Sequence, residues 1–257
     1  MKVVILAGGY GTRITEESYL KPKPMIEIGD YPILWHIMKI YAHFGYTEFI
    51  ICLGYKSHII KEYFAEYYLR TSDVTFDLAK NTMKIHNTQT EPWMVTLVDT
   101  GLDTMTGGRL LRVRQHIGDE TFLLTYGDGV ADVNINEQVE FHKSHGKLMT
   151  ITSTPVLPRF GLMEINNESL ITEFKEKSEK DATMVNAGFM IMNPGIFDYI
   201  DGDSTFLERE PMSRIAKDGQ LMAYEHRGFW QCMDTARDKE KLDELWRSGN
   251  PPWKVWQ

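Results

Sequence analysis

The chain has 257 residues, of which 42% are hydrophobic and 25% are charged, which is typical of one globular domain with a substantial core. Its formal net charge of −8 argues against nucleic acid and membranes as partners, because an acidic surface repels nucleic acid and anionic lipid. There is no apolar stretch of membrane-spanning length and no leader pattern, and two cysteines are too few for a disulfide framework, so we expect a cytoplasmic protein.

Apolar runs of strand length alternate with segments of helical period along the first part of the chain. Strands are predicted over Val3–Ala7, Glu48–Leu53, Val95–Val98, Phe122–Thr125 and Met149–Ser153, and helices over Pro32–Phe44, Ser57–Leu69, Thr106–His116 and Ile135–His145. This order predicts an α/β fold with a doubly wound, Rossmann-like, mainly parallel sheet. In such sheets ligands bind at the carboxyl ends of the strands.

Two stretches depart from this alternation. Residues 70–93 are polar and predict a hairpin or a long loop. Short strands are predicted over 161–165, 171–174, 184–192, 222–224 and 228–231, and a C-terminal helix over 236–246. We interpret them as a small mixed β extension on one domain, 1–257, in which the alternating part covers about 1–155 and the extension about 156–257. Trp253 and Trp256 in the tail pack either on this domain or on another subunit.

The first strand ends in a glycine-rich loop that also carries a cation. Gly8, Gly9 and Gly11 are followed by Thr12 and Arg13, and Lys23 lies in a Lys-Pro-Lys-Pro run close behind. Glycines let backbone N–H groups approach phosphate oxygens, and the cations neutralise their charge. The alternative is an ordinary glycine turn after a first strand. The dinucleotide fingerprint and the P-loop are both excluded by the spacing.

Two aspartates follow predicted strands. Asp128 lies in a Gly-Asp-Gly turn, and Asp234 precedes the last helix. Mg²⁺ bound to a nucleotide uses one or two carboxylates together with phosphate oxygens and water, so the pair predicts a magnesium site. Taken singly, Asp128 is also good turn chemistry and Asp234 a good helix cap.

Two further groups of residues suit a nucleotide sugar. Small and hydroxyl side chains over 97–109 fit a slot for a nucleobase, or a flexible loop with a helix cap. Lys175 and Lys177 share one strand face, which suits a phosphate or a solvated edge, and Asn186 can reach sugar hydroxyls.

Several phrases resemble one family closely and from end to end. LAGGYGTR, KPKPM, PILWHIMK, EPWMVTLVDTG, MTGGRL, LTYGDGVAD, RFG, NAGF and GFWQCMDT look like the glucose-1-phosphate cytidylyltransferases, within the sugar-phosphate nucleotidyltransferases. The resemblance implies that the nucleotide is bound by Leu6, Ala7, Gly8, Gly9, Gly11, Thr12, Arg13, Lys23, Thr104, Arg109, Gly127 and Asp128. It implies catalytic roles for Arg13 and Lys23, a Mg²⁺ site at Asp128 and Asp234, and sugar-phosphate contacts from Gly161, Glu176, Lys177, Asn186 and Gly188. Ser178 stands where the family has proline, and the loss of proline frees the backbone just after Lys177. The resemblance also implies a nucleotide-binding part over about 1–155 and a sugar-binding part over about 156–257.

The reaction that this resemblance implies joins CTP and α-D-glucose 1-phosphate into CDP-glucose and pyrophosphate, in a homo-oligomer. The alternatives are a cytidylyltransferase for another phosphorylated acceptor, a sugar nucleotidyltransferase that uses UTP or dTTP, and a non-catalytic nucleotide-sugar sensor. The presence of Arg13, Lys23 and both aspartates favours an enzyme, because a sensor has no need of all four.

Overall fold

The computed structural model describes residues 1–11, 19–87, 90–157, 162–176 and 182–256. Its centre is a seven-stranded sheet in the order β14-β10-β13-β8-β1-β4-β7. The strands are β1 (Val3–Leu6), β4 (Glu48–Leu53), β7 (Met94–Asp99), β8 (Phe122–Tyr126), β10 (Met149–Val156), β13 (Thr183–Met192) and β14 (Leu221–Glu225). Only β13 runs against its neighbours β8 and β10, so this sheet is mainly parallel, as predicted.

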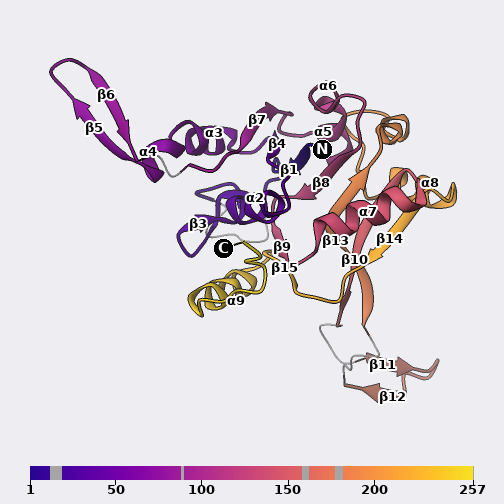
Figure 1. Ribbon diagram of the computed structural model, residues 1–257. Helices are drawn as coiled ribbons and strands as arrows, with labels where there is room; N and C mark the ends of the chain where they lie inside the picture. Colours follow the sequence, from indigo (N-terminus) through magenta and orange to yellow (C-terminus); the bar gives the residue numbers. More distant parts are fainter. Residues whose placement is uncertain (12–18, 88–89, 158–161, 177–181, 257) are drawn as a thin grey trace.

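Helices cover both faces of the sheet (Figure 1). They are α2 (Ile33–His43), α3 (Ser57–Ala65), α4 (Tyr67–Thr71), α5 (Thr106–Arg112), α6 (Arg114–Ile117), α7 (Ile135–His145), α8 (Glu210–Lys217) and α9 (Ala236–Arg247), with 3₁₀ turns η1 (Lys23–Met25) and η3 (Pro194–Tyr199). Along β1 the side chains alternate between two cores. Val3 and Ile5 pack with α2, α3, α7 and α9, whereas Val4 and Leu6 pack with α5, α6, η3 and α8. The sheet is therefore doubly wound.

Among the described residues, four two-stranded sheets lie around this core. They pair β2 (Glu27–Ile28) with β3 (Tyr31–Pro32), β5 (Asp73–Asp77) with β6 (Thr82–His86), β11 (Leu162–Ile165) with β12 (Ile171–Lys175), and β9 (Gly129–Ala131) with β15 (Trp230–Cys232). The β5–β6 hairpin and the β11–β12 pair extend away from the main body (Figure 1). Of the predicted extension only β11–β12 stands apart, because β13 and β14 pair directly with β8 and β10 in the main sheet.

The C-terminal tail packs on its own domain. Trp253 is fully buried and stacks on Phe229 and Trp246, and its indole N–H donates to His36 Nδ1 at 3.4 Å. In the part of the chain described here, no helix combines the length and apolar character needed to cross a membrane.

Candidate active site

A cavity of about 570 Å³ lies where β1 and β8 end, at the carboxyl ends of two adjacent parallel strands. It is lined by residues 6–11, 23–24, 102–106, 109, 125–129, 186–188, 206, 230, 232 and 234. Every predicted nucleotide-site residue that the structure describes lies in this lining: Leu6, Ala7, Gly8, Gly9, Gly11, Lys23, Thr104, Arg109, Gly127 and Asp128. Thr12 and Arg13 lie outside the described residues.

The two aspartates meet because two short strands pair. β9 begins directly after Asp128, β15 ends two residues before Asp234, and Gly129 is paired with Cys232. The amide of Met233 donates to the carbonyl of Asp128 at 2.8 Å, which fixes the two turns against each other. Carboxylates more than a hundred residues apart are thereby held on one wall of the cavity.

Asp234 is not the cap of the last helix. Thr235 is the N-cap of α9, and it exchanges hydrogen bonds with Asp238 in a capping box. The carboxylate of Asp234 instead points to Lys23. The structure thus excludes the helix-cap interpretation of Asp234, and its carboxylate lines the cavity.

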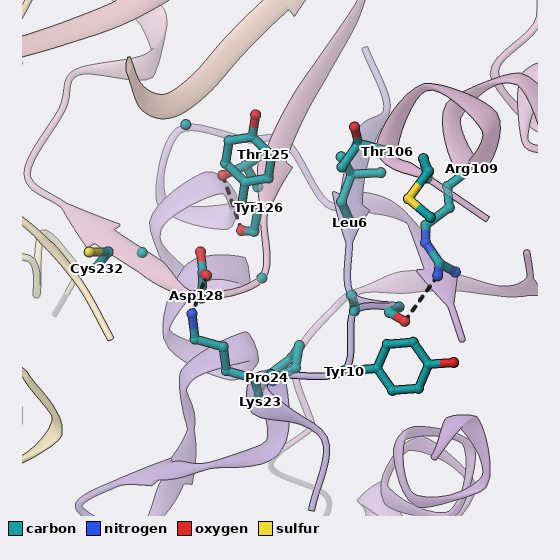
Figure 2. Close-up of a pocket in the computed structure, with 18 of the residues that line it drawn as sticks. Leu6, Tyr10, Lys23, Pro24, Thr106, Arg109, Thr125, Tyr126, Asp128 and Cys232 are labelled. Atoms are coloured by element: carbon teal, nitrogen blue, oxygen red, sulfur yellow. Dashed lines mark hydrogen bonds and ion pairs between the residues drawn. The ribbon is translucent and has the colours of Figure 1, made fainter. Parts of the chain in front are cut away.

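Lys23 joins both aspartates. Its Nζ lies 2.5 Å from Asp128 Oδ2 and 2.5 Å from Asp234 Oδ1, and its side chain is 12% exposed. Figure 2 shows the contact with Asp128. Burial by itself lowers the pKa of this ammonium, but the attraction of the two carboxylates outweighs burial and the pKa is raised. Lys23 is therefore a firmly charged group between two anions.

Arg109 connects the glycine-rich loop to the loop before α5. Its guanidinium is almost completely buried, and burial lowers its pKa. A Cβ on Gly8 would lie 2.1 Å from Nη1, so this close approach requires glycine. The dashed line in Figure 2 joins the guanidinium to this loop. In full, Nη1 donates to Leu53 O, Thr100 Oγ1 and Gly101 O, and Nη2 donates to Gly8 O and Leu102 O, at 2.7–3.1 Å.

A segment that we did not predict supports the same loop. Residues 203–208 pack against residues 105–108, and amides of Met105 and Gly107 donate to carbonyls of that segment. Cβ atoms on Gly107 and Gly108 would collide with its backbone, so these two glycines make room for protein and not for a base. Glu208 accepts hydrogen bonds from the hydroxyls of Tyr126 at 2.7 Å and Thr106 at 2.6 Å.

Comparison with known proteins is consistent with this geometry. The crystal structure of HddC from Yersinia pseudotuberculosis has a TM-score of 0.70 and 22% identity and covers 95% of this chain and 99% of that one, which shows a shared fold. The nucleotidyl transferase family model matches residues 2–235. Glucose-1-phosphate cytidylyltransferase of Salmonella typhimurium is 55% identical over 258 residues, covering 100% of both chains. The chain belongs to this cytidylyltransferase family. A probable glucose-1-phosphate cytidylyltransferase of Bacillus subtilis is 42% identical over 257 residues, again 100% of both chains.

The family resemblance inferred from the sequence is thus confirmed, and the chain is a nucleotidyltransferase. On the predicted sugar side of this cytidylyltransferase, Asn186 and Gly188 line the cavity. Glu176 is exposed at the end of β12 and is not part of the lining that the structure describes. Gly161 and Lys177 lie outside the described residues.

Some residues of the cytidylyltransferase cavity were not predicted from the sequence. Tyr126 sits beside Gly188, whose φ of +87° and missing Cβ leave room for the phenol ring. Burial, then the neighbouring Glu208 carboxylate, raises the pKa of Tyr126, so its hydroxyl stays protonated and donates. Its position just before Gly127 was a usable signal, because a strand's last side chain lies at the ligand edge.

Proposed function

We propose that the chain transfers the cytidylyl group of CTP to a phosphate oxygen of α-D-glucose 1-phosphate, giving CDP-glucose and pyrophosphate. The observation that carries the proposal is the cluster of Lys23, Asp128 and Asp234 in a cavity that the glycine-rich loop also lines. The names of the full-length relatives support CTP and glucose 1-phosphate as the substrates.

This chemistry needs no general base. The second pKa of a phosphomonoester is about 6, so glucose 1-phosphate is already an anionic nucleophile at neutral pH. Repulsion between that anion and the triphosphate is what opposes the reaction. The protein's task is to hold the two phosphates in line and to neutralise their charge. Backbone amides of the loop over 8–11 and the Lys23 ammonium suit that task. We assign Arg13, which lies outside the described residues, to the leaving pyrophosphate.

We further propose that Mg²⁺ binds at Asp128 and Asp234. Two carboxylates that already bracket one cation at 2.5 Å fit a hard divalent ion that completes its shell with phosphate oxygens and water. When bound, the ion would neutralise phosphate charge and polarise the phosphorus under attack.

Recognition of cytosine is assigned to Thr104 and Arg109. The Nη groups of Arg109 are used by the loop carbonyls and Thr100, and those contacts do not use its Nε–H. A donor there can meet the O2 or N3 acceptor of cytosine but is opposed by the N3–H of uracil. The Thr104 hydroxyl can accept from the cytosine amino group. Asn186, Gly188, Glu176, Lys177 and Gly161 remain the proposed contacts to the sugar phosphate.

The experiment is a pyrophosphate-release assay with CTP, UTP and dTTP against a panel of sugar 1-phosphates. We expect CTP with glucose 1-phosphate to give the highest kcat/KM. Asp128→Asn and Asp234→Asn should each lower turnover by orders of magnitude, while Asp218→Asn, whose carboxylate accepts from Tyr199 outside the cavity, should not. Equal use of UTP, or near-full activity of either cavity variant at saturating Mg²⁺, would contradict the assignment.

The oligomeric state and the location stay proposals. We infer a homo-oligomer. Trp253 is buried within its own chain, so this residue of the tail cannot form the interface between subunits. Exposed Phe76 and Leu78 on the β5–β6 hairpin offer apolar surface instead. A cytoplasmic location agrees with Cys52 and Cys232 being free thiols. Light scattering after gel filtration measures the subunit number, and a monomer over the working concentration range would refute the oligomer.

A further inference from the structure

The Lys23 ammonium occupies the space between the two carboxylates assigned to the metal. Both contacts are 2.5 Å, and the side chains of Asp128 and Asp234 are 31% and 24% exposed, so the three groups form a compact and largely sheltered cluster. A divalent cation that bridged the two aspartates through the oxygens that Lys23 uses, Asp128 Oδ2 and Asp234 Oδ1, would take the place of this ammonium. Lys23 and the metal ion therefore compete for the same oxygens.

Without a nucleotide, the described residues supply few ligands for a divalent metal ion at this site. Among the described residues no group of three or more His, Cys, Asp or Glu side chains could hold a metal ion. Two carboxylates supply only a minor part of the six-oxygen shell that Mg²⁺ prefers. If the metal entered without a nucleotide, Lys23 would lose both of its partners and would stay next to a doubly charged ion. The cost of an unpaired, mostly buried ammonium then adds to direct repulsion.

A nucleoside triphosphate removes both obstacles. Its phosphates provide oxygens that complete the metal's shell, and other oxygens that accept from Lys23. The ammonium can then leave the aspartates without losing its hydrogen bonds, and the charge of the cavity remains balanced. Lys23 would change partners from carboxylate to phosphate in the same event that brings the metal to Asp128 and Asp234.

We propose that Lys23 is a placeholder cation that keeps the metal-site carboxylates occupied until a nucleotide arrives, so that the divalent ion binds together with the nucleotide and not before it. This inference rests on the proposed function only in requiring a triphosphate substrate. It assigns Lys23 a second role, in the order of binding, besides its contact with phosphate. By linkage, the metal and the nucleotide must then strengthen each other's binding.

The test measures Mn²⁺ binding to the full chain without any nucleotide, by electron paramagnetic resonance of the free ion. We expect the unaltered protein to bind weakly and Lys23→Met to bind at least tenfold more tightly, because the carboxylates lose their competitor. Lys23→Gln, which keeps a polar side chain, should behave in the same way. Lys21→Met removes the same charge two residues away, from a lysine paired with Glu27, and should leave the affinity unchanged. Circular dichroism establishes that each variant is folded.

The gain must also depend on the carboxylates. Adding Asp128→Asn to Lys23→Met should abolish the tighter Mn²⁺ binding. Equal Mn²⁺ affinity of the unaltered protein and both Lys23 variants, or an equal gain in Lys21→Met, would overturn the proposal. These outcomes are independent of turnover. If the protein uses CTP but its Lys23 variants bind Mn²⁺ no more tightly, only the placeholder role is refuted. If the Lys23 variants bind Mn²⁺ more tightly but the protein does not use CTP, only the proposed reaction is refuted.

Discussion

Replacing Arg109 by methionine tests whether one buried guanidinium holds two loops of the cavity together. Methionine retains most of the length of the side chain and favours a helix, but it makes none of the five hydrogen bonds. We expect a loss of stability together with a weaker preference for CTP. Stability and base preference can be measured separately, so each part of the assignment can fail by itself.

The expected loss of stability depends on which hydrogen-bond partners the acceptors of Arg109 retain in the variant. Leu53 O still accepts from the amide and hydroxyl of Thr100, and Gly8 O still accepts from the amide of Tyr55. Leu102 lines the cavity and Gly101 is partly exposed, so the carbonyls of both residues can bind water. The loss is then the net value of several hydrogen bonds and not a full burial penalty, which gives about 2–4 kcal/mol of unfolding free energy. The preference for CTP over UTP should narrow by about tenfold, the value of one lost donor.

Urea denaturation of Arg109→Met and Arg112→Met gives the comparison. Arg112 lies one turn further along α5, and its ion pair with Asp203 is half exposed, so its removal should cost no more than about 1 kcal/mol. Similar losses in the two variants would refute the bridging role of Arg109. A CTP-to-UTP ratio of kcat/KM that survives Arg109→Met would move base discrimination to another residue.

Three further predictions concern single side chains. Gly8→Ala should cost as much stability as Arg109→Met, because the new Cβ displaces the guanidinium, and a double-mutant cycle in urea should show that the two losses do not add. Burial lowers the pKa of His36 from 6.5 to about 4, so between these pH values His36 binds a proton in the unfolded chain but not in the folded one. The free energy of unfolding should therefore fall by about 3 kcal/mol from pH 7 to pH 4. His36→Gln should remove that part of the pH dependence in denaturation curves. Glu208→Gln should raise KM for CTP about fivefold with kcat little changed, because glutamine at this position can replace only one of the two charged hydrogen bonds to Tyr126 and Thr106 beside the proposed cytosine site. Glu210→Gln should leave KM and kcat unchanged in the same assay.

The parallel core could be predicted from local patterns alone. β1, β4 and β8 are short apolar runs that end at glycine-rich or polar turns, and such strands are buried on both faces. The glycine-rich loop and Asp128 directly follow β1 and β8, so their meeting at one sheet edge follows from parallel pairing. The sequence alone therefore predicts which residues lie at the carboxyl edge of the sheet.

Contacts between distant segments could not be predicted in this way. β13 and β14 come after the regular alternation of strands and helices has ended, and only their pairing with β8 and β10 places them in the main sheet. The helix α8 spans only eight residues, too few for a clear helical period, and it was not predicted, nor was the 203–208 segment that precedes it. The small residues over 97–109 predicted a slot for a nucleobase, but the space beside Gly107 and Gly108 is taken by the backbone of residues 203–205.

The two cations of the cavity differ in what their partners allow. Arg109 donates mainly to backbone carbonyls, and these cannot be exchanged for phosphate without opening the loops that they belong to. Lys23 binds two side chains, whose oxygens a triphosphate can replace one for one. Without a substrate, Lys23 is neutralised by two carboxylates, whereas Arg109 is held by uncharged acceptors. Arg109 thus holds the loops of the site in place, whereas Lys23 is the cation that can exchange its partners when the substrate binds.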